Sequence, residues 1–217
     1  MNSTQKITGG VYLVINPSTQ KGILIAKLEA ALNGGISVVQ IWNKWDKDTG
    51  KTEIVTAICT VCKAYNVPVL INEDWTLLQQ YPLLDGVHFD KIPSDYGNIK
   101  RSINQEFIAG ITCGNDMKNV YWAIEKQLDY ISFCSLFPSS SAGSCEIVTP
   151  SIITSTRLLT DMPIFIAGGI TPENIVGLRQ TIPFDGVAVV GGIFKSDDPM
   201  QQTKEYVNAL QQKTEKK

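Results

Sequence analysis

The segment from Pro163 to Phe194 reads "PIFIAGGITPENIVGLRQTIPFDGVAVVGGIF" and contains one complete structural unit. A short apolar run covers residues 163–167, and a second one covers residues 185–190. The helical pattern between them begins at Thr171-Pro172, where a capping side chain precedes a proline at the first helical position. The segment therefore predicts a strand, a helix and a second strand, which is the repeating unit of a parallel sheet.

The same alternation of strand and helix patterns extends over the whole chain. The predicted strands cover residues 11–15, 37–42, 68–72, 85–89, 107–111, 129–134, 163–167 and 185–190. The predicted helices lie around residues 20–33, 50–65, 74–80, 97–103, 116–126, 150–160, 172–179 and 199–212. Eight near-continuous apolar strands favour a single (β/α)8 TIM barrel, with a doubly wound open sheet as the alternative, because a strand count does not prove closure.

The composition is that of an ordinary globular protein. Of 217 residues, 43% are hydrophobic and 18% are charged, and the net charge of −2 argues against a nucleic-acid-binding surface. No stretch reaches the roughly 18 uninterrupted apolar residues of a membrane span, and the N-terminus lacks the apolar core of a signal peptide. We expect one barrel domain over residues 1–217, with a frayed leader at 1–10 and a frayed tail at 213–217.

Five cysteines, an odd number, fit reduced thiols in the cytoplasm better than a set of disulfides. Cys59 and Cys62 fall within a helical pattern, so we interpret them as core residues rather than as a redox or metal site. Cys113 and Cys134, near the ends of two strands, are interpreted as packing residues. We therefore expect a cytoplasmic protein with no nucleic-acid or membrane partner, and the sequence leaves a homo-oligomer open.

The active site of a parallel barrel lies at the carboxyl ends of its strands. The loops after the seventh and eighth strands carry two glycine pairs, Gly168-Gly169 and Gly191-Gly192. Glycines at these two positions let backbone N–H groups approach an anion, although they could also serve only to turn the chain. We interpret the two pairs as a phosphate-binding site.

Seven segments resemble, in order and spacing, the thiamine phosphate synthase family, whose barrel the thiazole tautomerases share. They are "VYLVINP", "GGISVVQIWNK", "VPVLINED", "DGVHF", "DYISFCSLFPSSS", "IFIAGGITPEN" and "DGVAVVGGIF". The resemblance implies a transferase that joins hydroxymethylpyrimidine diphosphate to a thiazole phosphate, both small phosphorylated heterocycles. Diphosphate leaves with the help of Mg²⁺, and the thiazole nitrogen attacks the pyrimidine cation.

The resemblance assigns roles to residues at the ends of the second and third strands. Gln40 corresponds to the glutamine that contacts the pyrimidine, and Lys44 to the lysine that faces the diphosphate. Trp42 stands where the family has an arginine; it could stack on the substrate or fill the mouth of the barrel. Asn72 is retained as a catalytic residue, and Glu73 replaces the aspartate that binds the metal.

The fourth and fifth strands depart further from the family pattern. Pro93 occupies the position of the second metal carboxylate, and we expect Asp90, or less favourably Asp95, to replace it. Thr112 stands for a substrate-binding serine. The histidine base of the tautomerases falls at Gly114, which argues against a tautomerase.

The loop after the sixth strand keeps its hydroxyl groups and loses its cation. Ser139 and Ser141 match the family's substrate-binding threonines, whereas Ala142 replaces a lysine. With Trp42 this makes two absent cations, so the predicted catalysis is impaired or redirected unless Lys47, Lys91 or Arg101 compensates. The alternative is a non-catalytic barrel that binds a phosphorylated ligand as a sensor or pathway partner. His88, the only histidine, is interpreted as a hydrogen-bonded barrel residue.

Overall fold

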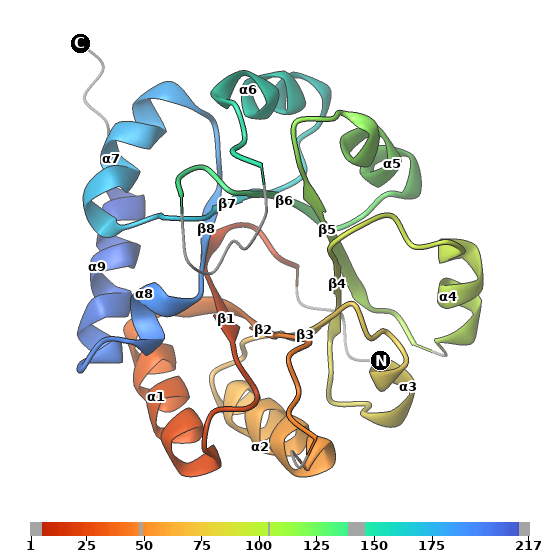
Figure 1. Ribbon diagram of the computed structural model, residues 1–217, viewed down its shortest axis with the longest axis vertical. Coiled ribbons are helices and arrows are strands. Elements are labelled where there is room, and N and C mark those ends of the chain that lie inside the picture. The colour runs from red at the N-terminus through yellow and green to blue at the C-terminus, as the bar shows by residue number, and fades with distance from the viewer. Residues whose placement is uncertain (1–5, 48–49, 104, 139–145, 213–217) are drawn as a thin grey trace.

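The computed structural model describes residues 6–47, 50–103, 105–138 and 146–212, and its strands form one closed barrel (Figure 1). The eight strands are β1 (Gly10–Ile15), β2 (Ile36–Ile41), β3 (Val69–Asn72), β4 (Gly86–Phe89), β5 (Ile108–Cys113), β6 (Tyr130–Cys134), β7 (Ile164–Ala167) and β8 (Gly186–Val189). Each pairs in parallel with its neighbours, and β1 pairs with both β2 and β8. This closure confirms the barrel and excludes the open sheet.

Helices surround the barrel on its outer side (Figure 1). They are α1 (Lys21–Gly34), α2 (Lys51–Ala64), α3 (Leu77–Gln80), α4 (Tyr96–Ser102), α5 (Lys118–Lys126), α6 (Pro150–Leu159), α7 (Pro172–Thr181), α8 (Gly191–Phe194) and α9 (Pro199–Gln211). All eight predicted helices are present, whereas the short α8 was not predicted. None of the helices in the described ranges is long and apolar enough to cross a membrane. The single domain stays a prediction, and residues 1–5 and 213–217 of its expected frayed ends lie outside the described residues.

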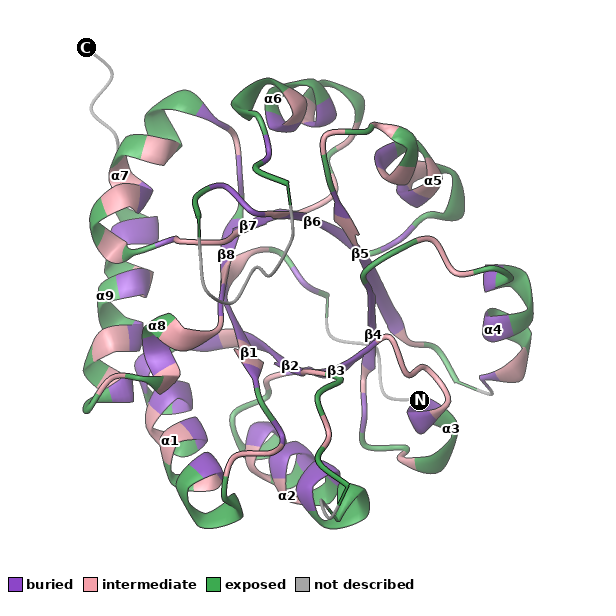
Figure 2. Ribbon diagram, in the orientation of Figure 1, coloured by how far each residue is buried: buried purple, intermediate pink, exposed green. Residues whose placement is uncertain are grey.

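The apolar residues pack in two layers, one on each face of the sheet. Figure 2 shows the strands as almost wholly buried, whereas the helices carry both buried and exposed residues. The outer layer fills the space between the strands and the helices. The inner layer plugs the barrel and consists of Ile7, Tyr12, Val38, Leu70, Ile108, Tyr130 and Phe165. Because both faces of the strands are buried, the strands are apolar at nearly every position, as expected for a parallel sheet.

Three aspartates satisfy backbone groups at the amino end of the barrel. Each precedes a strand, and its side chain accepts a hydrogen bond from a backbone N–H of the preceding strand. The pairs are Asp85 with Val69 at 2.8 Å, Asp129 with Ala109 at 2.7 Å, and Asp185 with Ile164 at 2.8 Å. These contacts tie neighbouring strands together at the end of the barrel opposite the expected site.

Candidate active site

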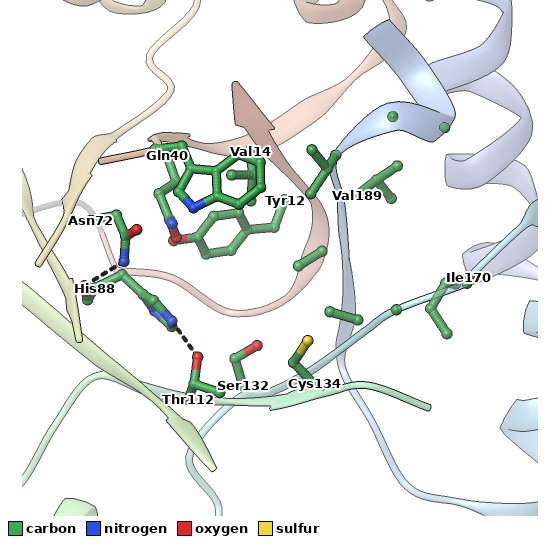
Figure 3. Close-up of a pocket in the computed structure, with 18 of the residues that line it drawn as sticks. Tyr12, Val14, Gln40, Asn72, His88, Thr112, Ser132, Cys134, Ile170 and Val189 are labelled. Atoms are coloured by element: carbon green, nitrogen blue, oxygen red, sulfur yellow. Dashed lines mark hydrogen bonds between the residues drawn. The ribbon is translucent and has the colours of Figure 1, made fainter. Parts of the chain in front are cut away.

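A cavity of about 630 Å³ opens at the carboxyl ends of the strands, and every strand contributes to it (Figure 3). One lining residue from each strand, in order, is Tyr12, Gln40, Asn72, His88, Thr112, Ser132, Ala167 and Ala188. Of the predicted site residues, nine line this cavity: Gln40, Trp42, Asn72, Asp90, Thr112, Gly168, Gly169, Gly191 and Gly192. Lys44 and Glu73 lie next to lining residues, and Ser139 and Ser141 lie outside the described residues.

The floor of the cavity is a row of hydrogen-bonded polar side chains. The Tyr12 hydroxyl donates to Gln40 Oε1 at 2.6 Å and lies 2.9 Å from the Tyr130 hydroxyl. His88 Nδ1 lies 2.7 Å from the Tyr130 hydroxyl, and His88 Nε2 lies 2.8 Å from Thr112 Oγ1. Burial lowers the pKa of His88 to about 4 and raises the pKa of both tyrosines. The row is therefore uncharged at neutral pH, and His88 is the hydrogen-bonded barrel residue that the sequence predicts.

A pair of carboxylates lies beside this row, at the ends of β3 and β4. Asn72 Nδ2 donates to Asp90 Oδ1 at 3.0 Å, and the backbone N–H of Asp90 donates to the Glu73 carboxylate. Desolvation raises the pKa of Asp90, and the charge of Glu73 adds to this effect. Asp95, the other candidate, is used elsewhere, because its side chain caps α4 by accepting from the Asn98 N–H at 2.8 Å.

These carboxylates decide how a metal could be held. The described part of the chain contains no group of three or more His, Cys, Asp or Glu side chains that could bind a metal ion. Mg²⁺, however, is commonly bound by one or two carboxylates together with waters and substrate phosphates. Glu73 and Asp90 fit this arrangement: desolvation is the main cause of the raised pKa of Asp90, and a cation between the two carboxylates would offset the smaller contribution from the charge of Glu73.

Trp42 and Lys44 follow β2 and contact each other at the cavity wall. Lys44 Nζ lies 3.7 Å from the centroid of the Trp42 ring, as in a cation–π contact. Trp42 is half-buried, whereas Lys44 is exposed and is not part of the lining. The cavity still reaches solvent, because exposed residues such as Thr171 and Lys195 line it. Trp42 thus forms part of one wall and leaves the cavity open.

The glycine pair after β7 is required by its backbone conformation and by the close packing around it. Gly168 and Gly169 have φ angles of +85° and +67°, which side-chain-bearing residues rarely adopt. A Cβ atom at Gly168 would lie 2.3 Å from Ser135 Oγ, and one at Gly169 would lie 2.6 Å from Phe137 Cβ. Residues 135–138, which follow β6, therefore lie directly against the glycine pair after β7. This supports the chain-turning role, and phosphate binding stays a prediction.

Lys195 and Tyr206 are among the lining residues that sequence reasoning missed. Lys195 follows α8, and a Cβ atom at Gly191 would lie 3.2 Å from its Cδ and Cε atoms. Its side chain therefore extends across the second glycine pair and brings a cation to the cavity. Tyr206, on α9, is buried and donates from its hydroxyl to the Ile170 carbonyl at 2.9 Å. Neither Lys47, Lys91 nor Arg101, the cations considered from sequence, lines the cavity.

Of the described cysteines, three are packed in the core as predicted, whereas Cys134 lines the cavity. Cys59, Cys62 and Cys113 are buried, and burial raises the pKa of Cys59 and of Cys113 to about 12. Such thiols stay protonated and unreactive at neutral pH. Cys134 is half-buried and lines the cavity beside Ser132 (Figure 3). The CxxC of α2 is therefore part of the core.

Comparisons with known proteins agree with one another. The family model described as thiamine monophosphate synthase matches residues 11–193. The thiamine-phosphate synthase of Nitrosococcus oceani is 31% identical over 168 residues, which are 77% of this chain and 76% of that protein. The protein of the same name from Xylella fastidiosa is 29% identical over 197 residues, 91% of this chain and 82% of the other.

Solved structures show the same fold. Thiamine phosphate pyrophosphorylase from Pyrococcus furiosus superposes with a TM-score of 0.77 at 18% identity, covering 93% of this chain and 95% of that one. (S)-3-O-geranylgeranylglyceryl phosphate synthase from Thermoplasma acidophilum superposes with a TM-score of 0.67 at 16% identity, covering 93% of both chains. At these identities the likeness concerns the barrel alone.

Proposed function

The chain belongs to the thiamine monophosphate synthase family, and we propose that it is a thiamine-phosphate synthase. In this proposal it joins hydroxymethylpyrimidine diphosphate to a thiazole phosphate and releases diphosphate. The observation that supports it best is the single cavity of about 630 Å³ that brings together Gln40, Asn72, Asp90, Thr112 and the two glycine pairs. Its size falls within the range of about 300–1,000 Å³ that is usual for small-molecule sites.

The proposed reaction needs no proton transfer. The bond between the pyrimidine methylene carbon and the diphosphate oxygen breaks, and its electron pair leaves with diphosphate. The lone pair of the thiazole nitrogen then forms the new carbon–nitrogen bond. The uncharged floor suits this reaction, since a neutral His88 with both ring nitrogens hydrogen-bonded is not a general base. The same observation, with Gly114 in place of the tautomerase histidine, disfavours a thiazole tautomerase.

The polar residues of the cavity have distinct positions in this proposal. Gln40 and Thr112 contact the pyrimidine, and the Trp42 face stacks on a flat ring. Asn72 positions Asp90 through its side-chain hydrogen bond. Glu73 and Asp90 would hold Mg²⁺, which when bound supplies positive charge for the departing diphosphate. Lys44, which contacts Trp42 at the cavity wall, would face the diphosphate.

The thiazole phosphate would occupy the opposite end of the cavity. Gly168, Gly169, Gly191 and Gly192 would bind it through backbone N–H groups, with Ser139 and Ser141 as further donors. Lys195 provides a cation at this end. In this proposal its ammonium group supplies positive charge that the sequence lacks at Ala142.

We also propose that the protein acts in the cytoplasm on small phosphorylated heterocycles. The buried thiols Cys59, Cys62 and Cys113 are consistent with a reducing compartment. The net charge of −2 provides no basic surface for nucleic acid.

The decisive experiment measures turnover. Purified protein is incubated with both substrates and Mg²⁺, and thiamine phosphate is detected by its fluorescence after oxidation. We expect product that requires Mg²⁺ and falls sharply in Asp90→Asn and in Lys44→Ala. Asp197→Asn, an exposed carboxylate outside the cavity, is the matched control. Absence of product while thiazole phosphate still binds by calorimetry would instead identify a non-catalytic barrel.

A further inference from the structure

The floor of the cavity contains four hydrogen bonds in an unbroken row. The row runs Gln40, Tyr12, Tyr130, His88, Thr112, with donor–acceptor distances of 2.6, 2.9, 2.7 and 2.8 Å. Each hydroxyl group has one hydrogen to donate, and a neutral imidazole has one N–H and one acceptor nitrogen. The direction of any one of these bonds therefore determines the direction of all the others.

The bond to Gln40 sets that direction. The Tyr12 hydroxyl donates to Gln40 Oε1, so it must accept from the Tyr130 hydroxyl. The Tyr130 hydroxyl then accepts from His88, which places the single imidazole proton on Nδ1. His88 Nε2 is left without a proton and accepts from the Thr112 hydroxyl. His88 is buried and its two ring nitrogens contact the Tyr130 and Thr112 hydroxyl groups, so the imidazole takes its neutral form and no second proton interrupts this order.

The rings in this row are held by close packing. The His88 and Tyr130 rings stack with centroids 5.7 Å apart at an angle of 21°, and the Tyr12 ring lies 5.7 Å from that of Tyr130. Gly110 makes room for Tyr130, since a Cβ atom there would lie 2.1 Å from Tyr130 Cζ. Tyr12 and Tyr130 are both buried. The positions of the rings are thus fixed by packing, and the bond to Gln40 sets the direction of the hydrogen bonds between them.

We propose that Tyr12, Tyr130 and His88 are positioning residues that set the hydrogen-bonding pattern offered to the ligand. Gln40 Oε1 is occupied by Tyr12, so Gln40 presents its Nε2 donors to the cavity. The Thr112 hydrogen is occupied by His88, so Thr112 presents an acceptor. A ligand must therefore offer an acceptor to Gln40 and a donor to Thr112.

This pattern restricts the hydrogen-bonding groups that a ligand presents at the two ends of the row, Gln40 and Thr112. An aminopyrimidine, as in the proposed reaction, offers ring-nitrogen acceptors and an amino donor. The oxo analogue of the same ring offers a protonated nitrogen beside a carbonyl, which is the reverse pattern. The inference rests on the proposed function for the identity of the ligand, but the direction of the row does not.

The direction of the row can be measured on the ligand-free protein. His88 is the only histidine, so ¹⁵N-labelled histidine gives the signals of one imidazole. We expect the Nδ1–H neutral tautomer near pH 7, read from long-range couplings between ring nitrogens and carbon-bound protons. Tyr130→Phe should lose this fixed tautomer. Tyr206→Phe, which removes a buried hydroxyl outside the row, should leave the tautomer unchanged. Protonation on Nε2 in the unaltered protein would overturn the inference.

The preference for the amino compound over the oxo compound is measured separately, by calorimetry with hydroxymethylpyrimidine and its oxo analogue. We expect the amino compound to bind roughly ten- to hundredfold more tightly, since the oxo compound leaves buried polar groups unpaired. Thr112→Val should reduce this preference and Thr112→Ser should restore it, which keeps the test valid if Tyr130→Phe does not fold. Equal binding of both compounds would overturn the pattern. Because no turnover is needed, a failure here is distinct from an inactive enzyme.

Discussion

Replacing Lys195 tests whether this residue supplies the positive charge that the chain lacks at Ala142, where the family has a lysine. Lys195→Met removes the ammonium group while keeping much of the apolar stem that lies over Gly191. A charge-assisted hydrogen bond contributes about 1.5–3 kcal/mol when shielded from water. Because Lys195 is exposed, solvent screening reduces this contribution to about 1–2 kcal/mol, which is roughly a 5- to 30-fold change in affinity.

The assay compares a thiazole phosphate with the corresponding thiazole alcohol. In the unaltered protein the phosphate should bind more tightly, and in Lys195→Met this advantage should shrink roughly 5- to 30-fold while the affinity for the alcohol stays the same. Raising the salt concentration should weaken the phosphate advantage in the unaltered protein, because exposed charges are screened. Lys204→Met, an exposed lysine of α9 outside the cavity, is the matched control for the change in net charge.

An equal loss of affinity for the phosphate and the alcohol would refute this reasoning. It would show that Lys195 shapes the loop after β8 and makes no charge contact with the ligand. Lys27 provides the reference for such a structural effect, since its Nζ donates to the Phe194 carbonyl at 2.7 Å and to the Ser196 carbonyl at 3.1 Å. Lys27→Met should therefore weaken binding of both compounds by displacing the loop.

Three further outcomes follow from the structure. Gly110→Ala forces the Tyr130 ring to move, and we expect it to lower the free energy of unfolding by about 1–3 kcal/mol, measured by urea denaturation. His88 has a pKa of about 4 when folded and about 6.5 when unfolded, so the unfolded state binds the proton first as the pH falls. The free energy of unfolding should therefore fall by about 3 kcal/mol between pH 6.5 and 4. His88→Gln should flatten this pH dependence. Asp90→Asn should weaken Mg²⁺ binding measured with diphosphate present, and unchanged Mg²⁺ affinity would remove Asp90 from the metal site.

Strand and helix positions could be predicted because the local pattern and the fold agree along most of the chain. The predicted ends differ where a polar residue continues a strand or a turn replaces a helix. The strand predicted to stop at residue 111 continues to Cys113, since Thr112 pairs with Ser132 of β6. The helix predicted from residue 74 begins at Leu77, because Glu73 has a φ of +62° and turns follow it.

The candidate site was predictable only where one strand end carries a recognisable motif. Gln40, Asn72 and Thr112 were found in this way, and the structure brings them into one cavity. The hydrogen-bonded row was not found, because Tyr12 and Tyr130 are 118 positions apart and each looks like an ordinary core aromatic in sequence. A local pattern also says nothing about Lys195, since only closure of the barrel and the path of α8 bring its side chain across Gly191.

The two ends of the cavity differ in how strongly the fold constrains them. The floor is made of strand residues whose hydrogen bonds depend on one another, so replacing one alters the direction or the occupancy of the rest. The phosphate end depends on exposed side chains carried by loops, and a long lysine can reach one phosphate from more than one loop. A cation absent at Ala142 can therefore be supplied from Lys195 without disturbing the barrel, whereas no equivalent exchange is available to Gln40. On this reasoning the absent cations are weak evidence against catalysis, and an intact floor is the stronger evidence for it.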